Sequence, residues 1–267
     1  MSHQVPGAQR ASRDLLLGRL DLMRGRYHQV IRRLKDKVRT PGPLEFEARI
    51  VLGRALQAVG KRQEAYQVLD GVAQAYNQGR VKTAWDLTLL GVALQLTEYP
   101  RDASETFEEA LRLAPTDLRP KVFAAALFLQ KYNFQAADEL YQEALKLVPG
   151  HVGALLGMAT IDIESERDYS TARERLEQIL TVSPECVPAH NLLARIDLEN
   201  ERLKAAMGRL RDHSLRLAPG NGEGLALLGA AVYLADDHKG FTQVERDARA
   251  VNPEPAGFYS TVSEHAS

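Results

Sequence analysis

The side chains that most often carry out catalysis are sparse in this chain and do not stand at catalytic spacings. No two of the seven histidines lie three or four residues apart, so no helix face offers a pair of metal ligands. Cys186 could act as a nucleophile with a distant histidine, but it directly follows Pro184 and Glu185, where a helix is expected to end. HExxH, CxxC and phosphate-binding glycine-rich motifs are absent. We therefore expect no catalytic residues, no metal, no cofactor and no enzymatic activity.

Two acidic stretches, 98–109 and 162–177, contain neighbouring carboxylates such as Glu108 and Glu109. Paired carboxylates can perform acid–base chemistry when burial separates their pKa values. Arginines interleave with both stretches, which favours solvated helix faces with helical ion pairs. The glycines of PGNGEG, residues 219–224, are interpreted as a turn and not as a phosphate loop.

The elements that must position any site repeat along the chain. Prolines recur every 34 or 35 residues, at Pro115, Pro149, Pro184, Pro219 and Pro253. Between them, two apolar-periodic stretches of about 12–14 residues flank a polar turn, which predicts two helices per unit. Proline ends the second helix because it lacks an amide hydrogen and biases the preceding residue out of the helix. The pattern predicts an all-α solenoid of about seven helix–turn–helix repeats.

We expect residues 1–10 to be a disordered N-terminal segment and residues 11–253 to form the solenoid. The predicted units are about 11–43, 46–80, 84–115, 118–149, 151–184, 187–219 and 222–253. The sixth unit has one extra residue before its proline. Residues 254–267 are either a capping helix or the start of a truncated eighth repeat, and we favour the second because Phe258 and Tyr259 begin a further pattern.

The repeating residues resemble the tetratricopeptide repeat. The first helix carries Leu-Gly, and the second carries alanine, a large apolar residue four later, alanine and then proline. The clearest matches are Leu17-Gly18, Leu52-Gly53, Leu90-Gly91 and Leu228-Gly229 for the first helix, and Ala65/Leu69, Ala103/Phe107, Ala137/Tyr141, Ala172/Leu176 and Ala206/Leu210 for the second. Small residues are expected where two helices cross closely. The resemblance implies a right-handed α-α superhelix.

By the same resemblance, the first helices line a concave groove that binds an extended peptide or a partner helix. The implied lining is Arg54, Gln57, Trp85, Thr88, Val92, Gln95, Arg119, Val122, Ala126, Asn191, Arg195 and Tyr233. Trp85 beside Arg119 is the favoured anchor, because tryptophan and arginine are enriched at interface hot spots. The alternative is that Trp85 packs against the preceding repeat. Asn191 and Arg195 resemble a fragment of a chaperone-binding carboxylate clamp, but its other members are missing and we predict no chaperone binding.

Composition limits the other functions. The net charge is −1, so we do not expect nucleic acid to be the partner, although residues 1–40 carry ten basic and three acidic side chains. The basic excess is interpreted as the solvent face of a first repeat, and a nucleic-acid or acidic protein partner is the alternative. The chain has one cysteine, so no intrachain disulfide can form. It contains no run of 18 apolar residues, so we expect no membrane span. The polar start lacks a signal peptide, so we expect a cytoplasmic location unless a native leader is missing.

The expected function is a non-catalytic protein–protein interaction scaffold. The alternative is the N-terminal repeat region of a larger bacterial protein whose catalytic, metallopeptidase-like domain lies outside this chain. Residues 131–159 resemble repeat regions that precede such domains. An HExxH motif encoded further downstream would favour that alternative.

Overall fold

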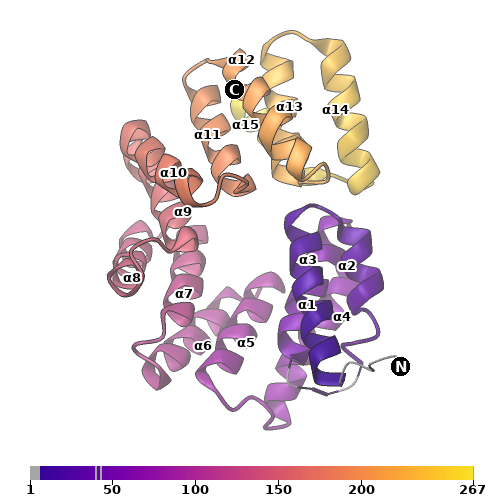
Figure 1. The fold of residues 1–267 in the computed structure, drawn as a ribbon, viewed down its shortest axis with the longest axis vertical. Coiled ribbons are helices and arrows are strands. Elements are labelled where there is room, and N and C mark those ends of the chain that lie inside the picture. The colour runs from indigo at the N-terminus through magenta and orange to yellow at the C-terminus, as the bar shows by residue number, and fades with distance from the viewer. Residues whose placement is uncertain (1–6, 40, 43, 267) are drawn as a thin grey trace, which may run out of the picture. The chain divides into compact units, whose positions relative to one another are not determined.

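A computed structural model describes residues 7–39, 41–42 and 44–266 of the chain (Figure 1). The described residues form an all-helical structure, as the sequence predicts. The chain divides into two units, Met1–Pro115 and Thr116–Ser267, which are described separately. Unit 1 contains α1 (Gly7–Met23), α2 (Tyr27–Leu34), α3 (Glu45–Ala58), α4 (Arg62–Asn77), α5 (Ala84–Leu96) and α6 (Pro100–Leu113). Unit 2 contains α7 (Leu118–Gln130), α8 (Phe134–Leu147), α9 (Val152–Ile161), η1 (Asp162–Glu166), α10 (Tyr169–Val182), α11 (Val187–Glu199), α12 (Leu203–Arg209), η2 (Leu210–Leu215), α13 (Gly222–Leu234), α14 (His238–Val251) and α15 (Ala256–Ala266).

Consecutive helices pair through short turns that share one backbone device. One residue in each turn is left-handed: Gly25, Gly60, Glu98, Tyr132, Arg167, Glu201 and Asp236, with φ between 52° and 78°. The residue that follows it donates its amide to a carbonyl near the end of the first helix, at 2.8–3.0 Å. In six of the seven turns this is the Schellman geometry, which satisfies carbonyls that the helix itself leaves unpaired. After Arg167 the bond runs from Asp168 to Asp162 and is one residue longer. The same turn therefore repeats even where the left-handed residue is not glycine.

The periodic prolines end the second helices in the expected way. Ala114, Val148, Ser183 and Asn252 precede Pro115, Pro149, Pro184 and Pro253, and each has φ between −134° and −140°. A residue before proline is pushed out of the helical region by the proline ring. Each proline thus directs the chain into the connection that leads to the next first helix.

The extra residue of the sixth predicted unit has a structural explanation. Its second helix changes from α12 to the π-helical segment η2, whose wider turn accommodates an added residue. Because of this, Ala206, Leu210 and Ala218 all stay buried although the spacing to Pro219 is longer. A second π segment, η1, extends α9 in the preceding pair.

The alanines and large apolar residues of the repeat form the core of each unit. Ala65, Ala103, Ala137, Ala172 and Ala206 are all fully buried, and their partners Leu69, Phe107, Tyr141 and Leu176 are at most 2% exposed. The leucine-glycine pairs serve close helix crossings: a Cβ added at Gly53 would lie 2.6 Å from the Leu69 side chain. Core packing therefore follows the repeating small and large positions that the sequence displays.

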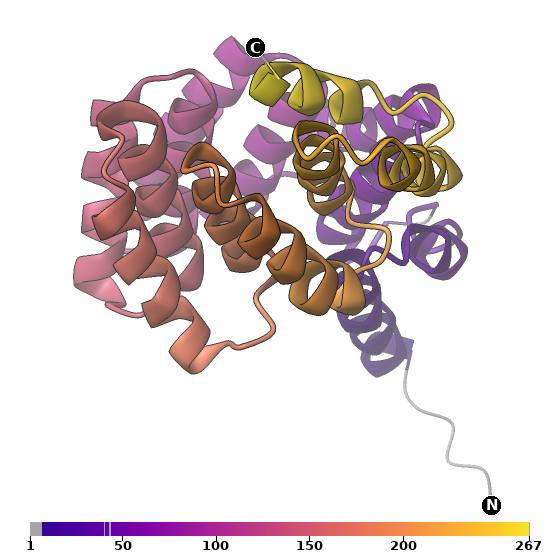
Figure 2. The same ribbon diagram turned by 90° about the horizontal axis from the view of Figure 1, so that it is seen from above.

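The chain ends differ in part from the predictions. Residues 7–10, which we expected to be disordered, belong to α1, because Leu15 and Leu22 anchor that helix to the core of unit 1. Residues 1–6 lie outside the described part of the chain. After Pro253, α15 packs on α13 through Phe258 and Val262 (Figure 2). The predicted unit boundaries, and an eighth repeat starting at α15, stay predictions.

Candidate functional site

In unit 1, polar side chains join three successive first helices. Trp85 on α5 donates its indole Nε1–H to Glu47 Oε1 on α3, at 2.8 Å. The second oxygen of Glu47 accepts a hydrogen bond from Arg19 on α1, which completes a charge-assisted link. The Arg19 side chain remains 46% exposed, so this row borders solvent. Through this bond Trp85 contacts α3 of the preceding repeat, which is the alternative interpretation of this residue.

Gln57 also joins first helices in unit 1. Its amide Nε2 on α3 donates to the Leu96 carbonyl at the end of α5, at 2.8 Å. Close to it, the hydroxyls of Tyr66 and Tyr99 are 3.4 Å apart on exposed parts of α4 and the α5–α6 turn. Gln57, Tyr66 and Leu96 line one shallow pocket. Gln57 therefore combines a structural bond with access to solvent, as a residue lining a binding face would.

Unit 2 contains a second row on α9, α11 and α13. Arg195 Nη1 on α11 donates to Glu164 Oε1, which extends from the α9 side, at 2.9 Å. Asn191, one helical turn earlier on α11, donates through Nδ2 to Asn221 Oδ1 and Glu223 Oε2, both at 2.9 Å. Its carbonyl oxygen accepts a hydrogen bond from the buried Ser214 hydroxyl. Asn191 thus fixes the orientation of Glu223, while the more accessible Arg195 and Glu164 border solvent.

The charges in this row influence one another. Burial alone would lower the pKa of Arg195, but its bond to Glu164 and the charges of Glu164, Glu264 and Glu199 outweigh this and raise the pKa above its ordinary value. Surrounding protein displaces water from the Glu223 carboxyl and raises its pKa, although the Asn191 bond and the Arg195 charge oppose that change. Glu164 therefore forms the ion pair with Arg195, and the carboxylates of Glu199, Glu223 and Glu264 lie near enough for electrostatic interaction with it.

Three residues predicted to line the groove lie in the packed interior instead. Thr88 and Asn191 are fully buried, and Val92 is 1% exposed. Thr88 uses its hydroxyl within α5, where it donates to the Ala84 carbonyl at 2.7 Å. Inner first helices pack against neighbours on both sides, which buries more of their circumference than one stripe. A groove lined by the predicted residues stays a prediction.

The other predicted residues keep some accessible surface. Gln57, Trp85, Gln95, Val122, Ala126 and Arg195 are half-buried, whereas Arg54, Arg119 and Tyr233 are exposed. Arg119 bonds to Asp117, the residue that caps α7, with its Nε 3.0 Å from both carboxylate oxygens. Tyr233 packs edge-on against Phe241 with ring centroids 5.8 Å apart. Trp85 lies in unit 1 and Arg119 in unit 2, so the proposed anchor pair stays a prediction.

Sequence reasoning missed Arg19, Glu47, Glu164 and Glu223. Glu223 falls within PGNGEG, which the sequence pattern predicts as a turn, but α13 begins at Gly222 and places Glu223 in its first turn. Glu164 falls in a stretch that the pattern predicts as a solvated ion-pair face, and its partner lies on the next first helix. The sequence does contain a signal for these pairs. Acidic and basic side chains occur at first-helix positions of adjacent repeats, where they can form ion pairs.

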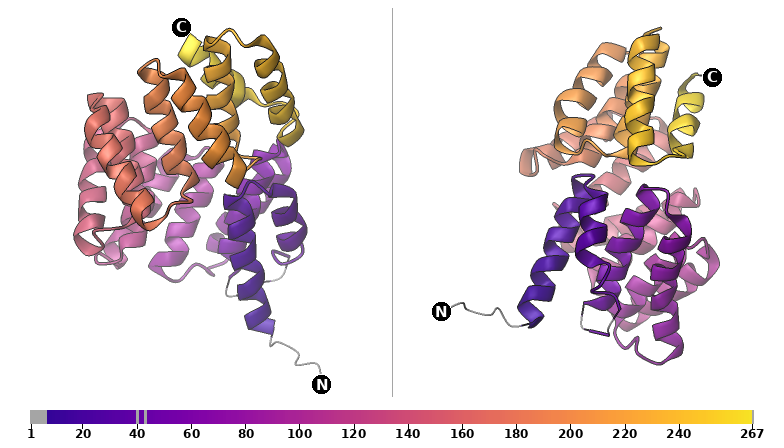
Figure 3. Two further views of the ribbon diagram at one scale, coloured as in Figure 1. Left: turned by 45° about the horizontal axis from the view of Figure 1, so that its top comes forward. Right: turned by 90° about the vertical axis from the view of Figure 1, so that its right-hand side faces the viewer.

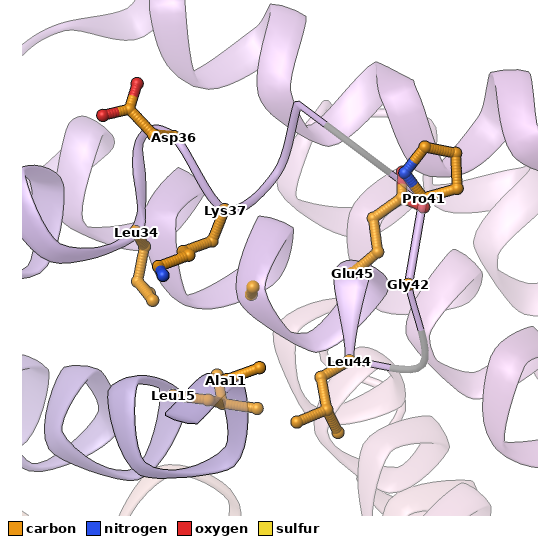
Figure 4. Close-up of a pocket in the computed structure, with 10 residues that line it drawn as sticks. Ala11, Leu15, Leu34, Asp36, Lys37, Pro41, Gly42, Leu44 and Glu45 are labelled. Atoms are coloured by element: carbon orange, nitrogen blue, oxygen red, sulfur yellow. The ribbon is translucent and has the colours of Figure 1, made fainter. Parts of the chain in front are cut away.

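The pocket in Figure 4 lies between α1, α2 and the start of α3. Apolar Leu15, Leu34 and Leu44 form one part of its wall, and the charged groups around it are paired within the protein. Lys37 Nζ is 3.2 Å from Asp14 Oδ2, and Glu45 binds both Arg49 and Arg80 at 2.8–2.9 Å. The pocket therefore offers a ligand apolar surface and few unpaired polar groups.

Across the part of the chain that the structure describes, no three His, Cys, Asp or Glu side chains are grouped so that they could hold a metal ion. Cys186 is buried, and this burial raises the pKa of its thiol, which disfavours the reactive thiolate. Among the described helices, none combines the length and the apolar character needed to cross a bilayer.

Comparison with known proteins agrees with the repeat architecture. Residues 164–231, which include Glu164, Asn191, Arg195 and Glu223, match the family model of the tetratricopeptide repeat. This segment therefore belongs to the tetratricopeptide repeat family. Proteins of this family are generally non-catalytic scaffolds for protein–protein interaction. No curated protein matches the chain.

Solved structures with the same fold are distant in sequence. A tetratricopeptide repeat protein from Parabacteroides merdae is 14% identical, with a TM-score of 0.64 over 97% of this chain and 100% of its own. TTC0263, a thermophilic tetratricopeptide repeat protein from Thermus thermophilus, is 17% identical, with a TM-score of 0.61 over 69% of this chain and 99% of its own. A chain of the APC/C hetero-tetramer Cut9–Hcn1 is 14% identical, with a TM-score of 0.61 over 92% of this chain and 48% of its own. At these identities the likeness shows the α-α solenoid fold alone.

Proposed function

We propose that this protein is a non-catalytic scaffold whose first-helix face binds a peptide or a helix of a partner protein. The observation that carries the proposal is the row on α9, α11 and α13, in which Arg195 bonds to Glu164 and Asn191 bonds to Glu223. These bonds hold accessible charged groups in fixed orientations. A ligand that meets pre-oriented groups loses less conformational entropy on both sides of the interface, which strengthens binding.

The chemistry of the row favours a ligand with basic side chains. Glu164, Glu199, Glu223 and Glu264 lie close to the single guanidinium of Arg195, so the local charge is negative. A lysine or arginine from a peptide would complete ion pairs there, and backbone amides of an extended peptide could donate to the same carboxylates. In unit 1, Trp85 and Glu47 offer an aromatic surface beside a carboxylate.

Selection from a random peptide library tests this proposal without a known partner. The purified chain is panned against displayed 12-residue peptides, and the enriched peptides are synthesised and titrated by fluorescence anisotropy. We expect lysine or arginine in the enriched set. Glu223→Gln preserves side-chain shape and an acceptor for Asn191 but removes the charge, so it should weaken binding by about tenfold, as expected for a lost charge-assisted bond.

The matched control is Arg246→Ala, which removes an exposed charge from the second helix α14 and should leave peptide affinity unchanged. We also expect the combination of Trp85→Ala and Arg119→Ala to reduce partner capture without a change in helix content. Peptides that bind the wild type and Glu223→Gln equally, or an enriched set without basic residues, would contradict the assignment to this row.

A further inference from the structure

Helix α1 presents an apolar stripe to solvent. Leu16, Leu20 and Met23 lie at i, i+4 and i+7, which places them on one side of the helix. Their exposed fractions are 63%, 40% and 69%. In the right-hand view of Figure 3, α1 forms an edge of unit 1, with its outer side uncovered by the other helices of that unit. The opposite side of α1 carries Leu15 and Gly18, which pack in the core.

Two of these three positions, those of Leu16 and Leu20, are buried in other repeats. The leucine-glycine pairs align α1 with α3, α5 and α13, so that Leu16 corresponds to Val51, Leu89 and Leu227. Leu16 is 63% exposed, whereas its three equivalents are 6%, 5% and 3% exposed. Leu20 is 40% exposed, and its equivalents Ala55, Ala93 and Ala231 are 0%, 2% and 0% exposed. Leu16 and Leu20 thus occupy positions that these repeats use for contact.

The contact at those positions is the second helix of the preceding pair. Val51 and Ala55 share a core cluster with Val30 and Leu34 of α2. In unit 2, Leu192 and Ile196 of α11 share a cluster with Ala172, Leu176 and Ile179 of α10. The covering helix therefore presents apolar residues at i and i+4 on α2, and at i, i+4 and i+7 on α10. The outer side of α1 has the surface chemistry to receive a helix of this kind.

Charge further defines the occupant. The two acidic residues of α1, Asp14 and Asp21, are buried and bonded to Lys37 and Arg33, both at 3.2 Å. One side of the outer stripe is bordered by basic side chains, from Arg13, which also lies 3.8 Å from Asp14, and from Arg24 directly after the helix. An apolar stripe with a basic border is complementary to an amphipathic helix with an acidic flank. Two copies of α1 facing each other would instead oppose like charges.

We propose that the outer side of α1, formed by Leu16, Leu20 and Met23 with Arg13 and Arg24, docks an amphipathic helix of a partner protein. That helix carries apolar residues at i, i+4 and i+7, with acidic side chains on the flank that meets Arg13 and Arg24. It takes the place that α2 takes on α3 and α10 takes on α11. This surface is separate from the Glu164–Arg195 row and does not depend on it.

The test uses a helix of the protein itself as a probe. A stapled, fluorescent peptide copies Tyr169–Val182, the α10 helix, with Arg173→Glu and Arg175→Glu to make its flanks acidic. The unsubstituted peptide has the same apolar stripe and is the matched probe. Fluorescence anisotropy with the full chain should show tighter binding of the acidic peptide, by about threefold to tenfold at low salt. Leu16→Ser with Leu20→Ser should weaken its binding by at least about tenfold.

Both substituted leucines are exposed, so circular dichroism should show an unchanged fold. Val182→Ser, at a residue 73% exposed on α10, is the control variant and should bind the peptide as the wild type does. Equal affinity of the two peptides, or of the wild type and the leucine variant, would overturn the proposal. It would also be overturned if the leucine variant abolished dimerisation seen by light scattering, or abolished binding to phosphatidylserine vesicles, because the occupant would then be a second copy or a membrane.

Discussion

Gly91→Ala should destabilise unit 1 although alanine is the better helix former. Gly91 lies within α5, where a Cβ would be 2.7 Å from Phe107 Cε1 and 2.9 Å from Cδ1 and Cζ. Phe107 is 1% exposed, so its ring has little room to move away. Overpacking of this kind costs about 1–3 kcal/mol, and the helix propensity of alanine offsets about 1 kcal/mol. The expected loss in free energy of unfolding is therefore about 1 kcal/mol.

Urea titration measures this change. Trp85, the only tryptophan, lies on the same helix as Gly91, so its fluorescence reports unfolding of unit 1. Gly208→Ala is the matched control, because a Cβ there meets nothing within 4 Å on α12. That variant should gain about 0.5–1 kcal/mol, followed by far-UV circular dichroism.

A second substitution separates the clash from other effects of Gly91→Ala. Phe107→Leu shortens the side chain that the new methyl group meets, so the two substitutions should couple favourably by at least about 0.5 kcal/mol in a double-mutant cycle. If Gly91→Ala stabilised the protein as much as Gly208→Ala, or if the cycle showed no coupling, the glycine would not be explained by close approach of α5 and α6.

The remaining predictions concern two buried polar groups of unit 2. Asp197 is 2% exposed and receives Arg173 at 3.0 Å, Arg202 at 2.8 Å and Arg209 at 3.7 Å. Asp197→Asn should therefore cost about 2 kcal/mol in urea titrations, because three guanidinium groups lose their shared anion, whereas Asp212→Asn on the exposed side of η2 should cost little. The ring of His190 stacks on His213 with ring centroids 4.6 Å apart. Burial lowers the pKa of His190 from its ordinary value. The charges of His213 and Arg209 lower this pKa further, whereas the hydrogen bond to the Pro184 carbonyl raises it. A lowered folded-state pKa gives stability that is present above about pH 6.5 and is lost as pH falls through the folded-state pKa. His190→Gln should therefore reduce the drop in urea midpoint that acid causes. An unchanged drop would refute this.

Much of the fold could be predicted because the repeat states the same local rules many times. The residue before each periodic proline leaves the helical region for a steric reason that depends on two neighbours in sequence. The burial of Ala137 and Tyr141 follows from helical periodicity alone. The turns are harder to predict, because Tyr132 and Glu201 adopt the left-handed conformation that glycine prefers. Pairing of the flanking helices and the Schellman bond offset that local cost, and neither is visible in a short window of sequence.

The candidate site is less predictable, because it depends on which residues of different helices meet. Arg195 and Glu164 are 31 residues apart, and Glu164 lies in the π segment η1, which the repeat pattern does not predict. The helix position of Asn191 predicts a groove residue, yet its neighbour Ser214 comes from the second helix of the same pair. A first helix packs against neighbours on two sides, so a single stripe of residues on it does not tell which side chains remain exposed. Positions of interhelix bonds need the three-dimensional register, which the repeat period alone does not supply.

The contrast between Leu16 and Leu227 shows how a repeat can reveal an interface that burial alone would hide. Single exposed leucines are common on protein surfaces and need no explanation. Here the same repeat position is 63% exposed in α1 and 3% exposed in α13, and a second position, Leu20 against Ala231, differs in the same direction. Repeats contact only their neighbours, so an apolar residue retained at a contact position has a physical use only when something covers it. Leu16→Ser should therefore change stability little in the isolated chain but matter when the complementary helix is present, whereas the same substitution at Leu227 should destabilise the chain in both conditions.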